Sequence, residues 1–500
     1  MEQALNIIKN RGLTQEQKVL GLARLAEGTV DVLNIDKETQ DYRDSGVMCD
    51  LFEGNAPFRP RYIVPDYEVF MEKGCEFLDL APAANIWEAT NNLLILYKHV
   101  PSITTMPVYL GNLDYLLEPY VKDETEARLA IKLFLKHIDA TITDSFCHAN
   151  IGPLETKAGH IILDVMKELQ LPTPNLTLKY DETTSEKLAI HSIDTALATA
   201  KPSFANNKMF TEDFRGEYGI VSCYNGLKVG GGANTLVRLR LGTFAKDVVS
   251  TEEFMETALP HLVGKTLQYI DERSRFLIEE SGFYETHFLV REGMLHKEQF
   301  TGLLGIVGLA ECVNTLFEKE GGDLRFGRDE AANELALKIT KKISGMIKDH
   351  KSEYAGAYFD NNHLFHSQVG IETDTNESPG CRIPVGEEPE MFEHVVQSAP
   401  FHQYFPSGIG DIFVFDKTYE NNKESILDIV RGAFNTGLRF YSLYGSDCDV
   451  VRVTGYLVKR SEIAKLERGE AVLRDTTVLG KGAADHSGAL SRKLRQTDEK

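Results

Sequence analysis

The sequence has few cysteines, and none of them form a closely spaced pair. Seven cysteines are spread over 500 residues, with no Cys-x-x-Cys motif. A disulfide framework or a structural zinc site needs clustered cysteines, so the sequence argues against both and predicts reduced thiols. The seven are Cys49, Cys75, Cys147, Cys223, Cys312, Cys381 and Cys448.

Basic residues and long apolar runs are also scarce. Lys and Arg number 54 against 75 Asp and Glu, giving a formal net charge of -21 at pH 7. Polyanion binding depends on neutralising phosphates, so nucleic acid is not expected as a partner. The most apolar run, about 302–313, is too short and too glycine-rich to span a bilayer, and the first residues lack a signal-peptide core. We therefore expect a cytoplasmic protein without membrane contact.

Strand and helix patterns alternate through the chain. Helical periodicity covers 156–169 and 186–200, and strand patterns cover 176–180 and 218–223. This alternation favours a mainly parallel α/β sheet or barrel in one large domain with terminal additions. We predict further helices at 14–28, 86–99, 123–141, 250–281, 309–320, 329–350 and 424–435, and strands at 235–241, 301–308 and 438–444.

Three polar stretches are predicted to lie outside regular structure. The segment FCHANIGP (146–153) should be a polar loop. The stretch 374–390 is rich in Pro, Gly and acidic residues and should be a long loop, which in a compact domain tends to be functional. The residues from about 484 onward are polar and should be frayed.

One strand pattern near the C-terminus is interrupted by a glycine. Residues 449–458 read DVVRVTGYLV, and Gly455 stands among β-branched and aromatic residues. The glycine could supply a turn or a bulge. Alternatively, loss of hydrogen from its Cα would leave a planar radical delocalised over the flanking amides, which only a residue without a side chain accommodates freely. These residues alone leave both explanations open.

A second candidate is Cys223, which follows a strand pattern and precedes the glycine-rich run 230–232. A lone buried cysteine is usually structural, whereas a cysteine delivered onto such a loop is poorly explained by packing. The glycine run is not a nucleotide-binding signature, because it lacks the GK[ST] of a phosphate-binding loop and a full GxGxxG.

Five segments together resemble the YjjI-type family of glycyl radical enzymes. They are CDLFEGNAPFRPRYIVPDY (49–67), HVPSITTMPVYLG (99–111), FCHANIGP (146–153), YGIVSCYNGL (218–227) and VRVTGY (451–456). The resemblance implies a barrel of two parallel half-sheets surrounded by helices, with a finger loop carrying Cys223 and a C-terminal loop carrying Gly455 inside. Residues 1–437 would form the barrel with N-terminal helical additions, and 438–500 the glycyl radical region.

The same resemblance implies a chemistry. A radical stored on Gly455, as a post-translational modification, would generate a thiyl radical on Cys223 that takes hydrogen from a small substrate of anaerobic metabolism. No bound organic cofactor is implied. S-adenosylmethionine and an iron–sulfur cluster would belong to a separate radical S-adenosylmethionine activase. A homodimer is left open.

The sequence indicates the type of reaction less clearly than it indicates the radical residues. Related dehydratases and decarboxylases commonly carry glutamate two residues after the radical cysteine, and formate lyases carry adjacent cysteines, whereas this chain has Asn225. The segment around Glu311 resembles one of anaerobic ribonucleotide reductases, but Cys448 stands alone, without the zinc-site cysteines of that family. The departure at Asn225 argues against assigning the mechanism of the dehydratases and decarboxylases or that of the formate lyases, and the expected reaction is a general elimination or rearrangement of an unknown substrate. Ribonucleotide-reductase-like reduction and an inactive barrel with a binding or regulatory role are the alternatives.

Several other residues are candidates for the site. Glu311 could be a general acid or base, or a surface carboxylate, and the neighbouring Cys312 fits a helix core better than a catalytic position. His363 and His366 are spaced i, i+3, but no carboxylate pattern accompanies them, and no metal site is predicted. Arg238 and Arg240 could bind an anion or form ordinary ion pairs. Residues predicted to contact substrate are His148, Asn150, Asn225, Arg382, Tyr404 and Ser407.

Overall fold

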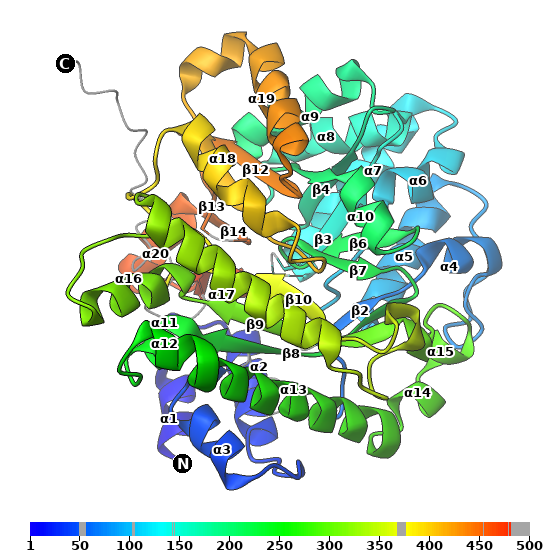
Figure 1. Ribbon diagram of the computed structural model, residues 1–500. Coiled ribbons are helices and arrows are strands. Elements are labelled where there is room, and N and C mark those ends of the chain that lie inside the picture. The colour runs from blue at the N-terminus through cyan, green and yellow to red at the C-terminus, as the bar shows by residue number, and fades with distance from the viewer. Residues whose placement is uncertain are drawn as a thin grey trace.

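Two five-stranded sheets organise the structure, and a β-hairpin lies between them (Figure 1). The computed structural model describes residues 1–49, 57–102, 106–142, 144, 146–367, 377–453, 455–478 and 480–481. Helices cover the outer faces of both sheets, and three N-terminal helices lie beside the first (Figure 1). The predicted α/β barrel architecture is confirmed.

The first sheet has the order β1-β8-β9-β10, with β2 also pairing with β8. Strands β8, β9 and β10 are parallel, whereas β1 and β2 run antiparallel to β8. Strand β9, FTGLLGIV, is buried along its whole length, as expected for a central parallel strand. The bounds are β1 Met48–Cys49, β2 Tyr62–Val64, β8 Gly231–Arg240, β9 Phe300–Val307 and β10 Leu364–Ser367.

The second sheet has the order β11-β12-β5-β4-β3. Strands β3, β4 and β5 are parallel to one another, and so are β11 and β12, but β12 meets β5 in an antiparallel pairing. This half is therefore mixed where the two parallel groups join. The bounds are β3 His148–Ile151, β4 Asn175–Tyr180, β5 Ser203–Asn206, β11 Asp411–Phe415 and β12 Phe440–Gly445.

The helices follow the apolar periodicity of the sequence. Helices α13 and α17 pack on the first sheet, and α9 and α19 pack on the second. The capping box at Thr14 is present, and Ser250 caps the helical segment that the sequence placed at 250–281. That segment comprises α12, α13 and two π-helical turns, Phe254–Ala258 and Phe276–Glu280. The helices are α1 Glu2–Lys9, α2 Gln15–Glu27, α3 Lys37–Asp44, α4 Tyr67–Lys73, α5 Ile86–Lys98, α6 Leu113–Leu117, α7 Glu124–Thr141, α8 Lys157–Leu169, α9 Glu186–Thr199, α10 Asn207–Asp213, α11 Leu241–Ala245, α12 Thr251–Glu253, α13 Leu259–Arg275, α14 Phe283–Thr286, α15 Phe288–Arg291, α16 Leu309–Lys319, α17 Glu330–Asp349, α18 Met391–His402, α19 Lys423–Thr436 and α20 Arg460–Glu467.

Three local predictions were wrong in informative ways. The predicted loop 146–153 contains the buried strand β3. The strand predicted over 218–223 ends at Val221, so Cys223 lies in the turn of a hairpin formed by β6 (Tyr218–Val221) and β7 (Asn225–Lys228). The single strand predicted over 449–458 is also a hairpin, of β13 (Val450–Arg452) and β14 (Leu457–Lys459). We call these the finger hairpin and the radical hairpin.

The predicted boundary at 437/438 cuts through the second sheet. It separates α19 from β12, yet β12 pairs with both β11 and β5. Strand β12 thus belongs to the barrel, and a separate glycyl radical region stays a prediction. The first part of the predicted loop 374–390 and the tail from 484 lie outside the described residues, and 377–390 contains no helix or strand.

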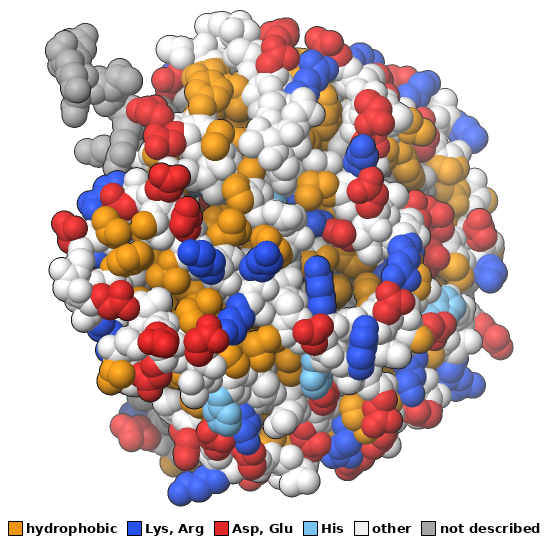
Figure 2. Space-filling view, viewed as in Figure 1, with side chains coloured by type: hydrophobic (Ala, Val, Ile, Leu, Met, Phe, Trp, Pro, Cys, Tyr) orange, Lys and Arg blue, Asp and Glu red, His pale blue; other side chains and the backbone are white. Residues whose placement is uncertain are grey.

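The surface is charged with both signs. Figure 2 shows acidic and basic side chains interspersed over one face, although the formal net charge of the chain is -21. Within the described ranges, no helix combines the length and the apolar character needed to cross a membrane.

Candidate active site

Cys223 lies at the tip of the finger hairpin, between the two sheets. Ser222 adopts a positive φ of 57°, an uncommon conformation for a residue with a side chain, and this tight turn presents Cys223. Strand β6 contacts β2 and β3, and β7 contacts β8, so the hairpin touches both sheets. Cys223 is only 3% exposed.

Two residues predicted to contact substrate hold the finger hairpin. Asn150 accepts from the N–H of Ile220 (2.8 Å) and donates to its carbonyl (2.9 Å), as a neighbouring strand would. Nδ1 of His148 donates to the carbonyl of Ser222 (3.0 Å), and Nε2 lies 2.8 Å from the Thr177 hydroxyl. Because a carbonyl can only accept, Nδ1 carries the proton. Burial lowers the pKa of His148 to about 3, so the ring is neutral at physiological pH. Substrate contact by His148 and Asn150 stays a prediction.

The radical hairpin places Gly455 at its own tip. The N–H of Val453 donates to the carbonyl of Tyr456 (3.2 Å) and closes the turn. The carbonyl of Gly455 accepts from Nδ2 of Asn175 (3.1 Å) and from Nη1 of Arg452 (3.0 Å). This carbonyl belongs to one of the two amides over which an unpaired electron on Gly455 would spread, and both donors would stabilise charge on its oxygen.

Arg452 connects the hairpin to the second sheet. Its Nη2 donates to Oδ1 of Asn175 (3.1 Å) and to the carbonyl of Ala200 (2.9 Å). Burial and the nearby charge of Arg382 lower the pKa of Arg452 to about 9, which leaves the side chain cationic at neutral pH. The arginine of the RVTGY motif therefore fixes the glycine carbonyl.

Gly455 and Cys223 meet directly. A side-chain carbon added to Gly455 would overlap Cβ of Cys223 and lie 2.9 Å from its Sγ. The hydrogen that occupies the side-chain position of Gly455 therefore points at the cysteine side chain. The glycine is required here by the close approach of the two hairpins, and this approach is the geometry that hydrogen transfer between Cα and sulfur needs.

The thiol of Cys223 is in a protonated state suited to hydrogen-atom transfer. Burial raises its pKa, although the N–H of Tyr224, the side chain of Ser222 and the charges of Arg61 and Arg382 act in the opposite direction. Its Sγ lies 3.7 Å from Oδ1 of Asn225. A thiol with a raised pKa keeps the S–H bond that hydrogen transfer uses, whereas nucleophilic catalysis would need a thiolate.

Polar side chains surround the finger tip, including three of the predicted substrate ligands. Asn225 follows the turn, and the carbonyl of Ser407 accepts from the N–H of Gly226 (2.8 Å). The guanidinium of Arg382 lies 5.8 Å from the ring centroid of Tyr224. A fourth polar residue, His366 on β10, was not predicted here, and its ring centroid lies 5.7 Å from that of Tyr224.

Other predicted residues lie elsewhere. Glu311, in the first turn of α16, accepts from the N–H and the hydroxyl of Ser378, and burial raises its pKa. No contact joins Glu311 to Cys223 within the described part of the chain, and its acid–base role stays a prediction. Cys312, on the buried face of α16, is part of the core, as expected for a core cysteine, and Arg240 forms an ion pair with Glu377 (3.4 Å).

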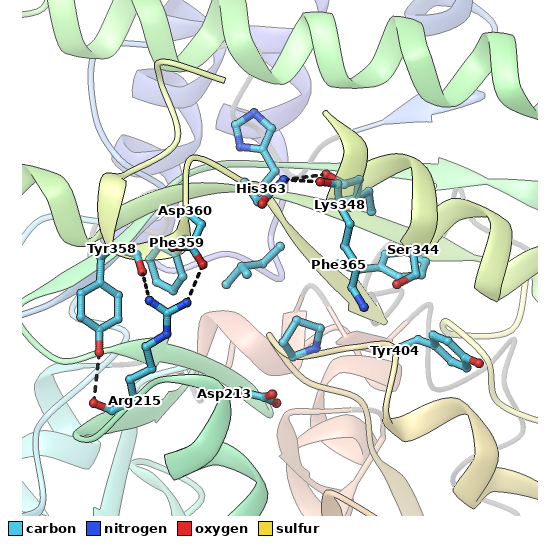
Figure 3. A pocket seen from close by; sticks show the side chains of 14 residues that line it. Asp213, Arg215, Ser344, Lys348, Tyr358, Phe359, Asp360, His363, Phe365 and Tyr404 are labelled. Carbon is cyan, nitrogen blue, oxygen red and sulfur yellow. Dashed lines mark hydrogen bonds and ion pairs between the residues drawn. The ribbon is translucent and has the colours of Figure 1, made fainter. Parts of the chain in front are cut away.

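Tyr404 lines a separate cavity of about 190 Å³ (Figure 3). Asp213, Arg215 and Lys348 also line it, whereas Cys223, Asn225 and Gly455 do not. In Figure 3 the guanidinium of Arg215 pairs with Asp360 (2.5 Å). Of the two predicted substrate ligands, Tyr404 thus lines this cavity, whereas Ser407 lies at the tip of the finger hairpin.

The two histidines considered for a metal also separate. His363 does not face His366 but lies with His350 and Asp271, and the candidate ligand atoms of these three residues are within 4.8 Å of one another. Both histidines are hydrogen-bonded to Asp271, with His363 Nε2 2.7 Å and His350 Nε2 2.8 Å from its carboxylate. Nδ1 of His363 also accepts from the N–H of Gly302 (3.1 Å). This network already satisfies the histidine nitrogens that would face a metal.

Comparison with known structures agrees with the barrel. The chain is similar in fold to an anaerobic ribonucleotide reductase from Thermotoga maritima, with a TM-score of 0.66 at 12% identity, covering 92% of this chain and 89% of that one. It is similarly close to the B12-independent glycerol dehydratase from Clostridium butyricum, with a TM-score of 0.67 at 10% identity, covering 98% and 87%. At such identities the likeness shows the fold alone.

Sequence relatives are closer. An uncharacterized protein of Haemophilus influenzae is 46% identical over 507 residues, covering 100% of this chain and 98% of the relative. The uncharacterized protein YjjI of Escherichia coli is 40% identical over 500 residues, covering 99% and 96%. The family model described as "Glycyl radical enzyme YjjI-like" matches residues 13–495. With Gly455 and Cys223 in contact inside a barrel of this type, the chain belongs to the YjjI-like glycyl radical enzyme family.

Proposed function

We propose that Gly455 stores a radical that Cys223 uses to act on a small substrate. The Gly455 Cα radical takes the hydrogen atom of the Cys223 thiol, which restores the glycine and leaves a thiyl radical. The thiyl takes a hydrogen atom from a substrate C–H bond, and the substrate radical eliminates a group or rearranges. The product radical then takes the hydrogen atom back from Cys223. The observation that carries this proposal is the contact between the side-chain position of Gly455 and Cys223.

The first radical would come from a separate activase. An organic radical made by reductive cleavage of S-adenosylmethionine, on an iron–sulfur cluster of that protein, would remove one hydrogen atom from Gly455. Because Gly455 is buried, this step needs the segment after Gly445 to open. Arg474 holds the segment to the barrel through an ion pair with Asp139 on α7, and it also pairs with Glu462 on α20 within the segment.

The reaction that follows is proposed as an elimination or a rearrangement. Asn225 occupies the position at which related dehydratases commonly carry glutamate, so proton transfer to a leaving group would need another residue. A ribonucleotide-reductase-like reduction is the alternative, and it would consume a reductant with each turnover. An inactive barrel would show neither a radical nor turnover.

Electron paramagnetic resonance tests the proposal. After anaerobic incubation with a radical S-adenosylmethionine activase, S-adenosylmethionine and a reductant, the protein should show a doublet from the single hydrogen left on the Gly455 Cα. Admission of air should then cleave the chain at Gly455. An unchanged chain length and the lack of a doublet with every competent activase would refute radical storage. A screen of metabolites consumed by the activated protein but not by Gly455→Ala would identify the substrate.

A further inference from the structure

Four polar groups around Cys223 have no hydrogen-bond partner within the described residues. They are Nδ2 of Asn225, Oγ of Ser407 and both ring nitrogens of His366. All three residues are fully buried, with exposures of 0%. Buried polar groups in folded proteins are almost always paired, so unpaired groups gathered beside a reactive atom indicate a binding site.

The backbone brings these three side chains together at the finger tip. Asn225 is two residues from Cys223, and Ser407 is bonded to the next residue, Gly226, through its carbonyl. The N–H of Ser407 in turn contacts the carbonyl of Phe365 (3.4 Å), directly before His366. The unpaired groups therefore come from three elements that are joined to each other: β7, β10 and the loop before β11.

The guanidinium of Arg382 brings a positive charge to the tip of the finger hairpin. Arg382 is 92% buried, since its exposure is 8%, and its Nε donates to the carbonyl of Gly410 (2.8 Å). Its two Nη groups make no hydrogen bond within the described ranges, although the charge acts on both Cys223 and Arg452. A guanidinium with its fork unpaired is suited to a two-point contact with a carboxylate or phosphate.

The surrounding charges leave this position positive. Asp411 is 3.9 Å from Nε of Arg382 and 3.5 Å from Nε2 of His394, so it is shared between two partners. A second cation, Arg61, acts on both Cys223 and His366. An anionic ligand could pair with the Nη groups of Arg382, which a neutral ligand would leave without an ionic partner.

We propose that the substrate is a small oxyanion-bearing compound, a carboxylate or a phosphate ester, that also carries a hydroxyl or carbonyl group. The Arg382 fork binds the anionic group, while Asn225, Ser407 and His366 hydrogen-bond the oxygen next to the C–H bond that Cys223 attacks. This assignment rests on the proposed function only for the role of Cys223, because binding itself requires no radical.

His366 is the residue that gives this site its specificity for a hydroxyl or carbonyl group. Burial and the charge of Arg61 lower its pKa to about 3, so the ring is neutral at physiological pH. A neutral imidazole donates at one nitrogen and accepts at the other. It can thus hold a hydroxyl in a fixed orientation.

Ligand binding to the unactivated full-length protein tests the proposal. The probes share a three-carbon skeleton: glycerol is neutral, glycerate carries a carboxylate and glycerol 3-phosphate carries a phosphate ester. Under anaerobic conditions and at constant ionic strength, we expect glycerate, glycerol 3-phosphate or both to raise the melting temperature, and glycerol to have no effect. The responding anion identifies which oxyanion the site takes. Arg382→Gln should weaken that probe at least tenfold, while Arg215→Gln, which alters the cavity of Figure 3, should leave its affinity unchanged.

His366→Leu separates a ligand-binding residue from a structural one. Because the ring nitrogens are unpaired, the apolar replacement should keep or raise the melting temperature of the unliganded protein and should abolish the probe-induced shift. A lower melting temperature with an intact probe response would overturn the role of His366. Equal shifts with glycerol, no shift with any anion, or an Arg382→Gln variant that binds as tightly as wild type would overturn the substrate class. A failed electron paramagnetic resonance experiment would overturn radical storage but not these binding results.

Discussion

The contact between Gly455 and Cys223 can be tested without any radical chemistry. A methyl group at position 455 would overlap Cβ of Cys223, an atom fixed by the backbone of the finger hairpin, and would approach its Cα to 3.2 Å. Rotating a side chain cannot relieve such an overlap. Overpacking costs about 1–3 kcal/mol, and the smaller unfolded-state entropy of alanine returns about 0.4–1 kcal/mol. Taking the middle of each range, we expect Gly455→Ala to favour opening of the radical hairpin by about 1.3 kcal/mol.

The assay is native-state hydrogen exchange on anaerobic, unactivated protein. The amide of Val453, bonded to the Tyr456 carbonyl, reports on opening of the tip, and about 1.3 kcal/mol corresponds to an exchange rate roughly nine times faster. A double-mutant cycle then identifies the cause. Cys223→Gly removes the overlapped Cβ and should cancel the effect of Gly455→Ala, whereas Cys223→Ala keeps that atom and should not.

A matched control comes from α19. A Cβ at Gly432 meets no atom within 4 Å, so Gly432→Ala should leave exchange of the Val453 amide unchanged. Additive effects of Gly455→Ala and Cys223→Gly, or equal relief by Cys223→Ala, would refute the inference that the two hairpin tips are in contact.

Three further predictions concern the neighbouring residues. Cys223→Ala should retain the glycyl radical doublet after activation but lose all turnover, and turnover at the wild-type rate would exclude the thiyl step. Arg452→Lys should lose the hydrogen bonds to the carbonyls of Gly455 and Ala200 and leave these buried acceptors unpaired, at a cost of about 1–3 kcal/mol each. The lifetime of the radical signal should then shorten, and an unchanged lifetime would contradict this role. His148 has its pKa lowered to about 3 by burial, so its stabilising contribution is complete above pH 6.5 and is lost as the pH falls toward 3. The stability advantage of wild type over His148→Asn should therefore shrink by about 2 kcal/mol between pH 7 and pH 5 in denaturant unfolding, and a constant difference would indicate an exposed or already charged histidine.

The elements set by local pattern were predictable from the sequence. Capping residues and apolar periodicity marked the helices closely, as at Thr14 and Ser250. The radical hairpin was not, because both of its arms carry the same β-branched and aromatic residues and a continuous pattern results. Whether such a pattern continues as one strand or folds back on itself is decided by pairing, here Val451 with Val458, which local propensity does not encode.

Two polar residues of the site conceal the strand in which they lie. His148 and Asn150 made their segment look like a loop, but in β3 their side chains bond to the finger backbone and so tolerate complete burial. His363 and His366 suggested a shared helix face. In extended chain, residues three apart point to opposite sides, so His363 reaches Asp271 while His366 faces Tyr224. The position of His366 at the site thus follows only from the extended conformation of its segment.

The two hairpins that meet at the site are held in different ways, and the difference fits their proposed tasks. The finger hairpin is bonded to the barrel through its backbone, with Ser222 donating to the Val108 carbonyl and Gly226 donating to the Ser407 carbonyl. The radical hairpin is tied to the second sheet through the side chains of Asn175 and Arg452. Side-chain bonds of this kind can be broken and remade without unpairing a sheet, whereas displacing the finger would disturb both sheets. Under the proposed function, the element that would present its glycine to an activase is therefore the one that is more easily released, and Cys223 would stay in place to receive the radical when the hairpin returns.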